Sequence, residues 1–116
     1  MRKDVRKPRR SILYVPGSNE KALKKSSKLE VDALIYDLED SVAPNAKESA
    51  RDSLIKIINS RVNKDKEQVI RINSLGTDLG RDDLKVLDHC TPDAILIPKI
   101  NSADDVIECE KLIKNK

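Results

Sequence analysis

Residues 33–40 read ALIYDLED, and this stretch decides the fold. The block ALIY is apolar without alternation, which is typical of a buried strand in a parallel sheet that is covered on both faces. Three carboxylates, Asp37, Glu39 and Asp40, follow this block within four residues. Because α/β proteins bind ligands at the carboxyl ends of their parallel strands, these acids mark one candidate position for a site.

Three further apolar blocks predict strands of the same kind, at residues 11–15 (SILYV), 68–72 (QVIRI) and 94–97 (AILI). Polar segments with helical spacing separate the blocks and begin at recognisable caps. They predict helices over residues 19–29 after Ser18, over 44–58 from Pro44, over 81–88, and after the capping-box pattern SADD at 102–105. The fold class is therefore α/β, with four consecutive βα units.

This pattern permits two architectures. Four parallel strands form either an open, doubly wound sheet or the N-terminal half of a TIM (β/α)8 barrel, whose usual length is roughly 250 residues. Periodicity alone does not choose between the two. In either case the 116 residues predict a single domain over residues 11–116, preceded by a basic arm over residues 1–10.

The net charge of +3 is concentrated in residues 1–10, which hold six basic residues and one acidic residue. The remainder is nearly neutral, and Tyr14 and Tyr36 are the only Phe, Trp or Tyr residues. A surface that binds nucleic acid usually combines widely spread basic residues with aromatic rings that stack on bases. We therefore expect no nucleic-acid partner.

No apolar run approaches the roughly 20 residues of a membrane span, and residues 1–10 lack the apolar core of a secretory signal. We expect no membrane partner and a cytoplasmic location, with an organellar matrix as the alternative if residues 1–10 belong to an Arg-rich presequence. Cys90 and Cys109 are too far apart for a CxxC motif, which predicts reduced thiols and no zinc or redox site.

Arg71 is the sharpest single signal in the sequence. Ile70 and Ile72 point to one face of the third strand, so Arg71 points to the other, into a layer that a parallel sheet normally fills with aliphatic side chains. A buried guanidinium requires an anion, and its planar fork suits a carboxylate. We favour a substrate carboxylate over the alternative, an ion pair with Glu39 or Asp40 on the neighbouring strand.

The acids of residues 37–40 repel one another unless a cation, a basic side chain or a helix N-terminus offsets their charge. Such a cluster suits a divalent metal site, and the alternative is that the acids cap the following helix. The turn VPGS at residues 15–18 offers backbone amides to a phosphate.

Three lysines are further candidates. Lys21 and Lys25 share one side of the first predicted helix and suit the phosphates of a nucleotide-like cofactor, although a solvated helix face explains them equally well. Lys99 ends the fourth strand and is an electrostatic partner for the acids of residues 37–40.

Taken together, the strand-end motifs resemble the citrate lyase β-subunit family, which includes citrate lyase β-like proteins and malyl-CoA lyases. The motifs stand in family order and at family spacing, and they are RSILYVPGS (10–18), DLEDSVAP (37–44), VIRIN (69–73) and LIPK (96–99). They cover nearly all of the chain from Arg10 onward.

The resemblance implies that residues 11–116 are a partial (β/α) barrel domain, and that the full-length protein is a homo-oligomer. It also implies a Mg²⁺-dependent carbon–carbon lyase that acts on acyl-CoA and keto-acid molecules of the citryl-CoA or malyl-CoA type. The resemblance implies that Arg71 is the catalytic residue and binds the carboxylate or carbonyl end of the substrate. It implies that Tyr14, Lys21 and Lys25 contact the acyl-CoA. It also implies that Glu39 and Asp40 orient the waters bound to Mg²⁺.

The family's direct Mg²⁺ ligands, a glutamate and an aspartate after strands five and six, have no counterpart among these 116 residues. We therefore expect a truncated chain that is inactive alone, because no metal would offset the charge that develops on the enolate. Two alternatives stay open: a non-catalytic half-barrel that self-associates, and an α/β module that binds a phosphate or CoA.

Overall fold

The computed structural model describes residues 11–98, 100 and 102–114, and the basic arm expected over residues 1–10 lies outside this part. The four βα units are β1 (Ile12–Pro16) and α1 (Glu20–Lys25), β2 (Ala33–Asp37) and α2 (Lys47–Ser60), β3 (Glu67–Arg71) and α3 (Asp78–Leu84), and β4 (Ala94–Leu96) and α4 (Ala103–Lys114). Short 3-10 helices cover Ser26–Lys28, Pro44–Ala46 and Lys85–Asp88. The four predicted strands are confirmed, with no end displaced by more than one residue.

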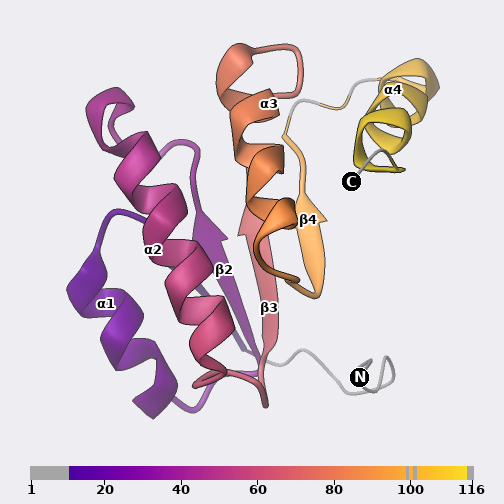
Figure 1. Ribbon diagram of the computed structural model, residues 1–116. Helices are drawn as coiled ribbons and strands as arrows, with labels where there is room; N and C mark the ends of the chain where they lie inside the picture. Colours follow the sequence, from indigo (N-terminus) through magenta and orange to yellow (C-terminus); the bar gives the residue numbers. More distant parts are fainter. Residues whose placement is uncertain (1–10, 99, 101, 115–116) are drawn as a thin grey trace.

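All four strands are parallel, and their order in the sheet is β1-β2-β3-β4. Figure 1 shows α1, α2 and α3 side by side on one face of the sheet, with α4 beyond β4. A doubly wound sheet reverses its strand order and carries helices on both faces. Neither feature is present among the described residues.

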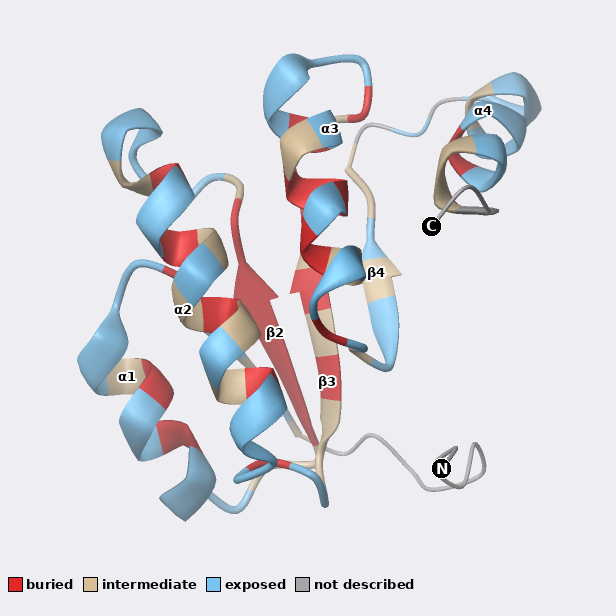
Figure 2. Ribbon diagram, in the orientation of Figure 1, coloured by how far each residue is buried: buried red, intermediate tan, exposed pale blue. Residues whose placement is uncertain are grey.

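The core lies between the sheet and the helices. Leu34, Tyr36 and Ile70 point toward the helices and are each at most 1% exposed, whereas Ile12 and Tyr14 on the opposite face are 50% and 52% exposed. Figure 2 shows a second contrast, between strands, with β2 buried over its whole length and β4 largely exposed. The sequence predicted cover on both faces. Within the described residues the helices cover one face, and on the other face Ala33 and Ile35 of β2 are buried while Ile12 and Tyr14 of β1 are exposed.

The helices agree with their predicted positions, but two caps differ. α1 is capped by Asn19 instead of Ser18, because the Asn19 side chain accepts a hydrogen bond from the third amide of the helix. α3 begins at Asp78 and not near Arg81, because the hydroxyl of Thr77 caps it in the same way. The N-cap predicted for α4 is confirmed, since the hydroxyl oxygen of Ser102 accepts a hydrogen bond from the backbone amide of Asp105.

Within the described residues, no helix combines the length and the apolar character that crossing a membrane requires.

Gly80 allows α3 to pack directly against the loop that follows β3. A Cβ built at Gly80 would overlap the carbonyl oxygen of Ser74 and would lie 2.6 Å from that of Asn73. We expect Gly80→Ala to lower the free energy of unfolding by about 1–3 kcal/mol, because the backbone must move to make room. Urea denaturation followed by circular dichroism measures this loss.

Gly76→Ala is the matched control, because the nearest atom to a Cβ at Gly76 is the Ser74 hydroxyl at 3.9 Å. We expect this change to alter the free energy of unfolding by less than about 1 kcal/mol. Equal losses in the two variants would contradict the proposed overlap at Gly80.

Candidate functional site

The carboxyl ends of β1, β2 and β3 bring most of the predicted site residues together. Pro16, Asp37 and Arg71 are the last residues of the three strands and lie in register across the sheet. Because successive residues of a strand point to opposite faces, Asp37 and Arg71 share the face that the helices leave uncovered. This open face is also the one that carries Tyr14.

Arg71 forms a two-pronged ion pair with Asp37. Its Nε donates to Oδ1 and its Nη2 donates to Oδ2, each at 2.8 Å. The sequence favoured a substrate carboxylate for Arg71 and gave an ion pair with Glu39 or Asp40 as the alternative. The main partner within the chain is instead Asp37, the residue in register with Arg71. Glu39 makes only a longer ion pair, with 3.6 Å between Arg71 Nε and its Oε1.

Asp37 is the most strongly held carboxylate of the acidic stretch. Burial alone would raise its pKa, but hydrogen bonds from Arg71, from the Ser41 hydroxyl and from the backbone amides of Glu39 and Ser41 outweigh this effect and hold the pKa well below its usual range. The hydrogen bond to Asp37 raises the pKa of Arg71 in turn. Of the three counter-charges that the sequence left open, the basic side chain is the one that the structure supplies.

Tyr14 and the two remaining acids surround the guanidinium. The Arg71 Cζ atom lies 5.3 Å from the centre of the Tyr14 ring, within the range of a cation–π contact. The Glu39 side chain is 10% exposed, and Asp40 is exposed. The result is a partly exposed cluster on the open face, called the Arg71 cluster below, in which a fixed cation faces an aromatic ring and a partly buried acid.

A buried polar network lies next to the acidic loop of residues 37–40 and was not predicted from the sequence. The Lys47 ammonium donates to the carbonyl oxygens of Leu38 and Glu39 and to the side-chain oxygen of Asn73. The Asn73 amide group donates to Leu38 and to Asp83. One signal could have revealed Lys47, because it falls on the buried stripe of α2 together with apolar residues.

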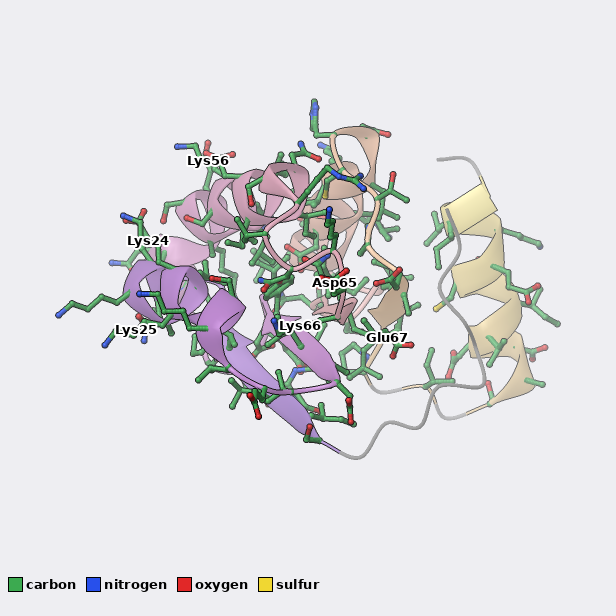
Figure 3. The ribbon with its side chains drawn as sticks, turned by 90° about the horizontal axis from the view of Figure 1, so that it is seen from below. Lys24, Lys25, Lys56, Asp65, Lys66 and Glu67 are labelled. Atoms are coloured by element: carbon green, nitrogen blue, oxygen red, sulfur yellow. The ribbon has the colours of Figure 1, made fainter. Side chains whose placement is uncertain are left out.

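Lys21 and Lys25 do not lie next to Arg71 in the structure. Lys21 and Lys25 are exposed on α1, which covers the face of the sheet opposite Arg71, and Figure 3 shows Lys25 projecting away from the sheet. Within the described residues, no hydrogen bond or ion pair joins either lysine to Asp37, Glu39 or Arg71. Lys99 lies outside the described residues, so its predicted role is not placed.

Gly17 brings the tip of β1 close to the tip of β2. Its amide donates to the carbonyl oxygen of Asp37 at 2.8 Å, and a Cβ at this position would lie 3.0 Å from the same oxygen. The Gly17 amide is therefore engaged within the sheet and is not one of the free amides that the turn was expected to offer.

Among the described residues, no group of three or more His, Cys, Asp or Glu side chains could hold a metal ion. Cys90 and Cys109 are free and buried, and burial raises the pKa of both thiols.

The ion pair predicts how acid affects stability. The folded-state pKa of Asp37 lies below the unfolded value of about 3.9, so its stabilising effect is complete above that pH and is lost as the pH falls toward the folded-state pKa. We expect Asp37→Asn to be less stable at neutral pH and to lose less stability on acidification. Asp40→Asn, an exposed control, should follow the unaltered chain in urea unfolding below about pH 4. A flattened acid profile in the control would argue against Asp37.

Comparisons with known proteins find similar chains. The (3S)-malyl-CoA thioesterase of Cereibacter sphaeroides is 44% identical over 106 residues, which cover 91% of this chain and 37% of that protein. The citrate lyase subunit beta of Escherichia coli is 37% identical over 90% of this chain and 35% of its own length. This chain therefore spans little more than a third of either relative.

A solved structure is also similar. The protein CitE from Mycobacterium tuberculosis, in complex with magnesium, acetoacetate and coenzyme A, matches 87% of this chain and 37% of its own with a TM-score of 0.70 and 31% identity. The model of the family described as HpcH/HpaI aldolase/citrate lyase matches residues 10–116, which include every residue of the Arg71 cluster. The resemblance seen in the strand-end motifs is confirmed, and the chain belongs to the HpcH/HpaI aldolase/citrate lyase family.

Proposed function

We propose that residues 11–116 are the first four βα units of a (β/α)8 barrel. The sequential order of the parallel strands and the helices on a single face support this architecture, because both are properties of a barrel wall. The apolar side chains exposed on the other face, Ile12, Tyr14 and Leu96, would then line the barrel interior. The strands that close the barrel are not among these residues.

The whole protein, on this proposal, is a carbon–carbon lyase that acts on an acyl-CoA of the citryl-CoA or malyl-CoA type. Two observations on similar proteins support a CoA thioester: the name of the (3S)-malyl-CoA thioesterase, and the coenzyme A bound to CitE. Thioester hydrolysis is the second candidate, because the relative named a thioesterase has the higher identity. Products separate the two, since cleavage releases a shorter acyl-CoA and an oxo acid, whereas hydrolysis releases free CoA.

Arg71 is the observation that carries the proposal. Asp37 engages Nε and Nη2, and a guanidinium has five N–H donors. Its remaining donors belong to a side chain that is 23% exposed on the open face. The ion pair with Asp37 thus fixes the plane of the guanidinium and leaves part of it to bind a substrate carboxylate or carbonyl oxygen, which lowers the ordering cost of binding.

Magnesium is the proposed metal, because Glu39 and Asp40 place carboxylate oxygens near the Arg71 guanidinium. Mg²⁺ retains several waters, and carboxylates suit hydrogen bonds to such waters. Bound Mg²⁺ would supply positive charge that offsets negative charge on the substrate oxygen. Glu39 and Asp40 would orient those waters, and the direct metal ligands would lie elsewhere, so we expect no turnover by residues 1–116 alone.

Tyr14, Lys21 and Lys25 are the proposed contacts for the acyl-CoA, and Lys99 is a proposed electrostatic partner of the acids. Tyr14 contacts Arg71 directly and is half exposed on the open face. The two lysines would act at longer range, because they lie on α1. The self-associating half-barrel and the CoA-binding module remain the alternatives, and sedimentation of the purified chain tests the former.

Arg71 provides the main test of the proposal. We expect Arg71→Ala to weaken the binding of acetyl-CoA or of an oxo acid in the presence of Mg²⁺ by about tenfold to a hundredfold, because charged hydrogen bonds are lost. Arg71→Lys should restore little, since an ammonium cannot replace the planar fork. Isothermal titration calorimetry measures both. Arg81→Ala removes an exposed guanidinium and serves as the control. Binding that is equal in all of these proteins would remove Arg71 from the site.

Lys21 is tested by its salt dependence. We expect Lys21→Ala to weaken acetyl-CoA binding by up to about fivefold at low ionic strength, and by less at high salt, because an exposed charge is screened. Lys85→Ala, which removes an exposed lysine of the unit after β3, is the control. If the two variants bind acetyl-CoA alike at every salt concentration, Lys21 has no part in binding.

A further inference from the structure

We propose that Lys47 is a positioning residue that fixes the backbone of the β2 tip and thereby holds Glu39 beside Arg71. This role rests on the proposed function in that it concerns the same Arg71 cluster. It is nevertheless a property of the chain without ligand, and it can be measured without one.

The surroundings of the Lys47 ammonium match its three N–H donors one by one. The acceptors are the carbonyl oxygens of Leu38 and Glu39 at 2.8 and 2.9 Å and the side-chain oxygen of Asn73 at 3.2 Å. Lys47 is only 5% exposed, although lysine is among the residues that are least often buried. A buried cation is tolerated only where oxygen atoms satisfy it, so this arrangement fixes the oxygens as well as the ammonium.

The peptide group between Leu38 and Glu39 is held at both of its polar ends. Its carbonyl oxygen accepts hydrogen bonds from Lys47 and from the Asn73 amide at 2.9 Å, and its N–H donates to Asp37 Oδ1 at 2.9 Å. The C=O and N–H of a trans peptide point in opposite directions, and the described residues contain no cis peptide bond. Lys47 and Asp37 therefore hold the peptide from opposite sides and fix its plane.

The next peptide is held in the same way on one side, because Lys47 also binds the carbonyl oxygen of Glu39. The Cα of Glu39 thus lies between two peptide groups that share one ammonium. From this position its side chain reaches the guanidinium, with 3.6 Å between Oε1 and Arg71 Nε. Arg71 balances the side chains of the acidic loop, and Lys47 binds its main chain from the other side.

The third acceptor of Lys47 is itself anchored. Asn73 donates to Asp83 from its backbone and its side-chain amide, each at 2.7 Å, and Asp83 accepts Arg51 Nε at 2.7 Å. α2, the end of β3 and α3 are thereby joined behind the loop. Among the described hydrogen bonds, the Lys47 ammonium is the one group of this network that binds the carbonyl oxygens of both Leu38 and Glu39.

The experiment compares Lys47→Met, Lys47→Arg and, as the matched control, Lys56→Met. Lys56 lies on the same helix and projects away from the sheet in Figure 3. Amide hydrogen exchange is read by NMR at Glu39, and at Leu54 in the core of α2 as the reference for global opening. In Lys47→Met we expect exchange at Glu39 to be about tenfold faster after correction for Leu54, with a shifted Arg71 Nε–H resonance.

Lys47→Arg should recover part of the protection at Glu39, and Lys56→Met should leave it unchanged. If Glu39 and Leu54 accelerate by the same factor in Lys47→Met, Lys47 stabilises the fold in general and the positioning role is overturned. Should Lys47→Met fail to fold, the unaltered chain supplies the second measurement. Its Lys47 ammonium must then exchange protons far more slowly than that of Lys56, and equal rates would end the proposal.

Each of these readings is made without CoA or metal. A chain that fails to bind acetyl-CoA would contradict the proposed function and leave the role of Lys47 measurable. Conversely, normal acetyl-CoA binding together with unchanged exchange at Glu39 would contradict the positioning role alone.

Discussion

The ion pair between Arg71 and Asp37 is the constraint on which the candidate site depends. It joins the last residues of two neighbouring strands and takes one carboxylate out of an otherwise repulsive acidic stretch. Because the guanidinium is fixed in its plane, its remaining donors face a defined part of the open face, beside Tyr14. The contact that finishes the edge of the sheet therefore also prepares the group that would bind an anion. Glu39 and Asp40 are left as the acids that can serve a ligand.

The sheet has two different faces, and this difference separates stability from function. Apolar packing on α1, α2 and α3 fills one face, where Leu34, Tyr36 and Ile70 are buried. The other face carries the ion pair, the aromatic ring and exposed aliphatic side chains. The polar network of Lys47, Asn73 and Asp83 lies at the strand ends, between these two regions. Through this network the packing of α2 and α3 holds the backbone of the acidic loop that follows β2.

Much of the fold could be predicted from the sequence, because four short, continuous apolar blocks alternate with polar segments that have helical spacing. The candidate site at the carboxyl ends of the strands stays a prediction, and the parallel sheet brings Tyr14, Asp37 and Arg71 to one face there. Asp37 was missed as the partner of Arg71, because the sequence alone does not give the register of the parallel strands, which places Asp37 opposite Arg71. Lys47 was missed because a lysine at a helix start is usually solvated, and only the buried stripe of α2 distinguishes it. The cap of α1 depended on which of two adjacent polar residues faces the first turn, a choice that propensity does not make.

The strand order has a consequence for how this chain acquires its structure. Hydrogen bonds that join successive strands connect residues 21, 34 and 25 positions apart, so each pairing closes a loop of modest and similar length. The entropy of closing such loops differs little between them, and the pairings among these four strands need no partner from a remote part of the chain. During synthesis β2 can pair with β1 before β3 has left the ribosome, and each later unit adds to an edge that already exists. Assembly can thus follow the direction of translation, one unit at a time.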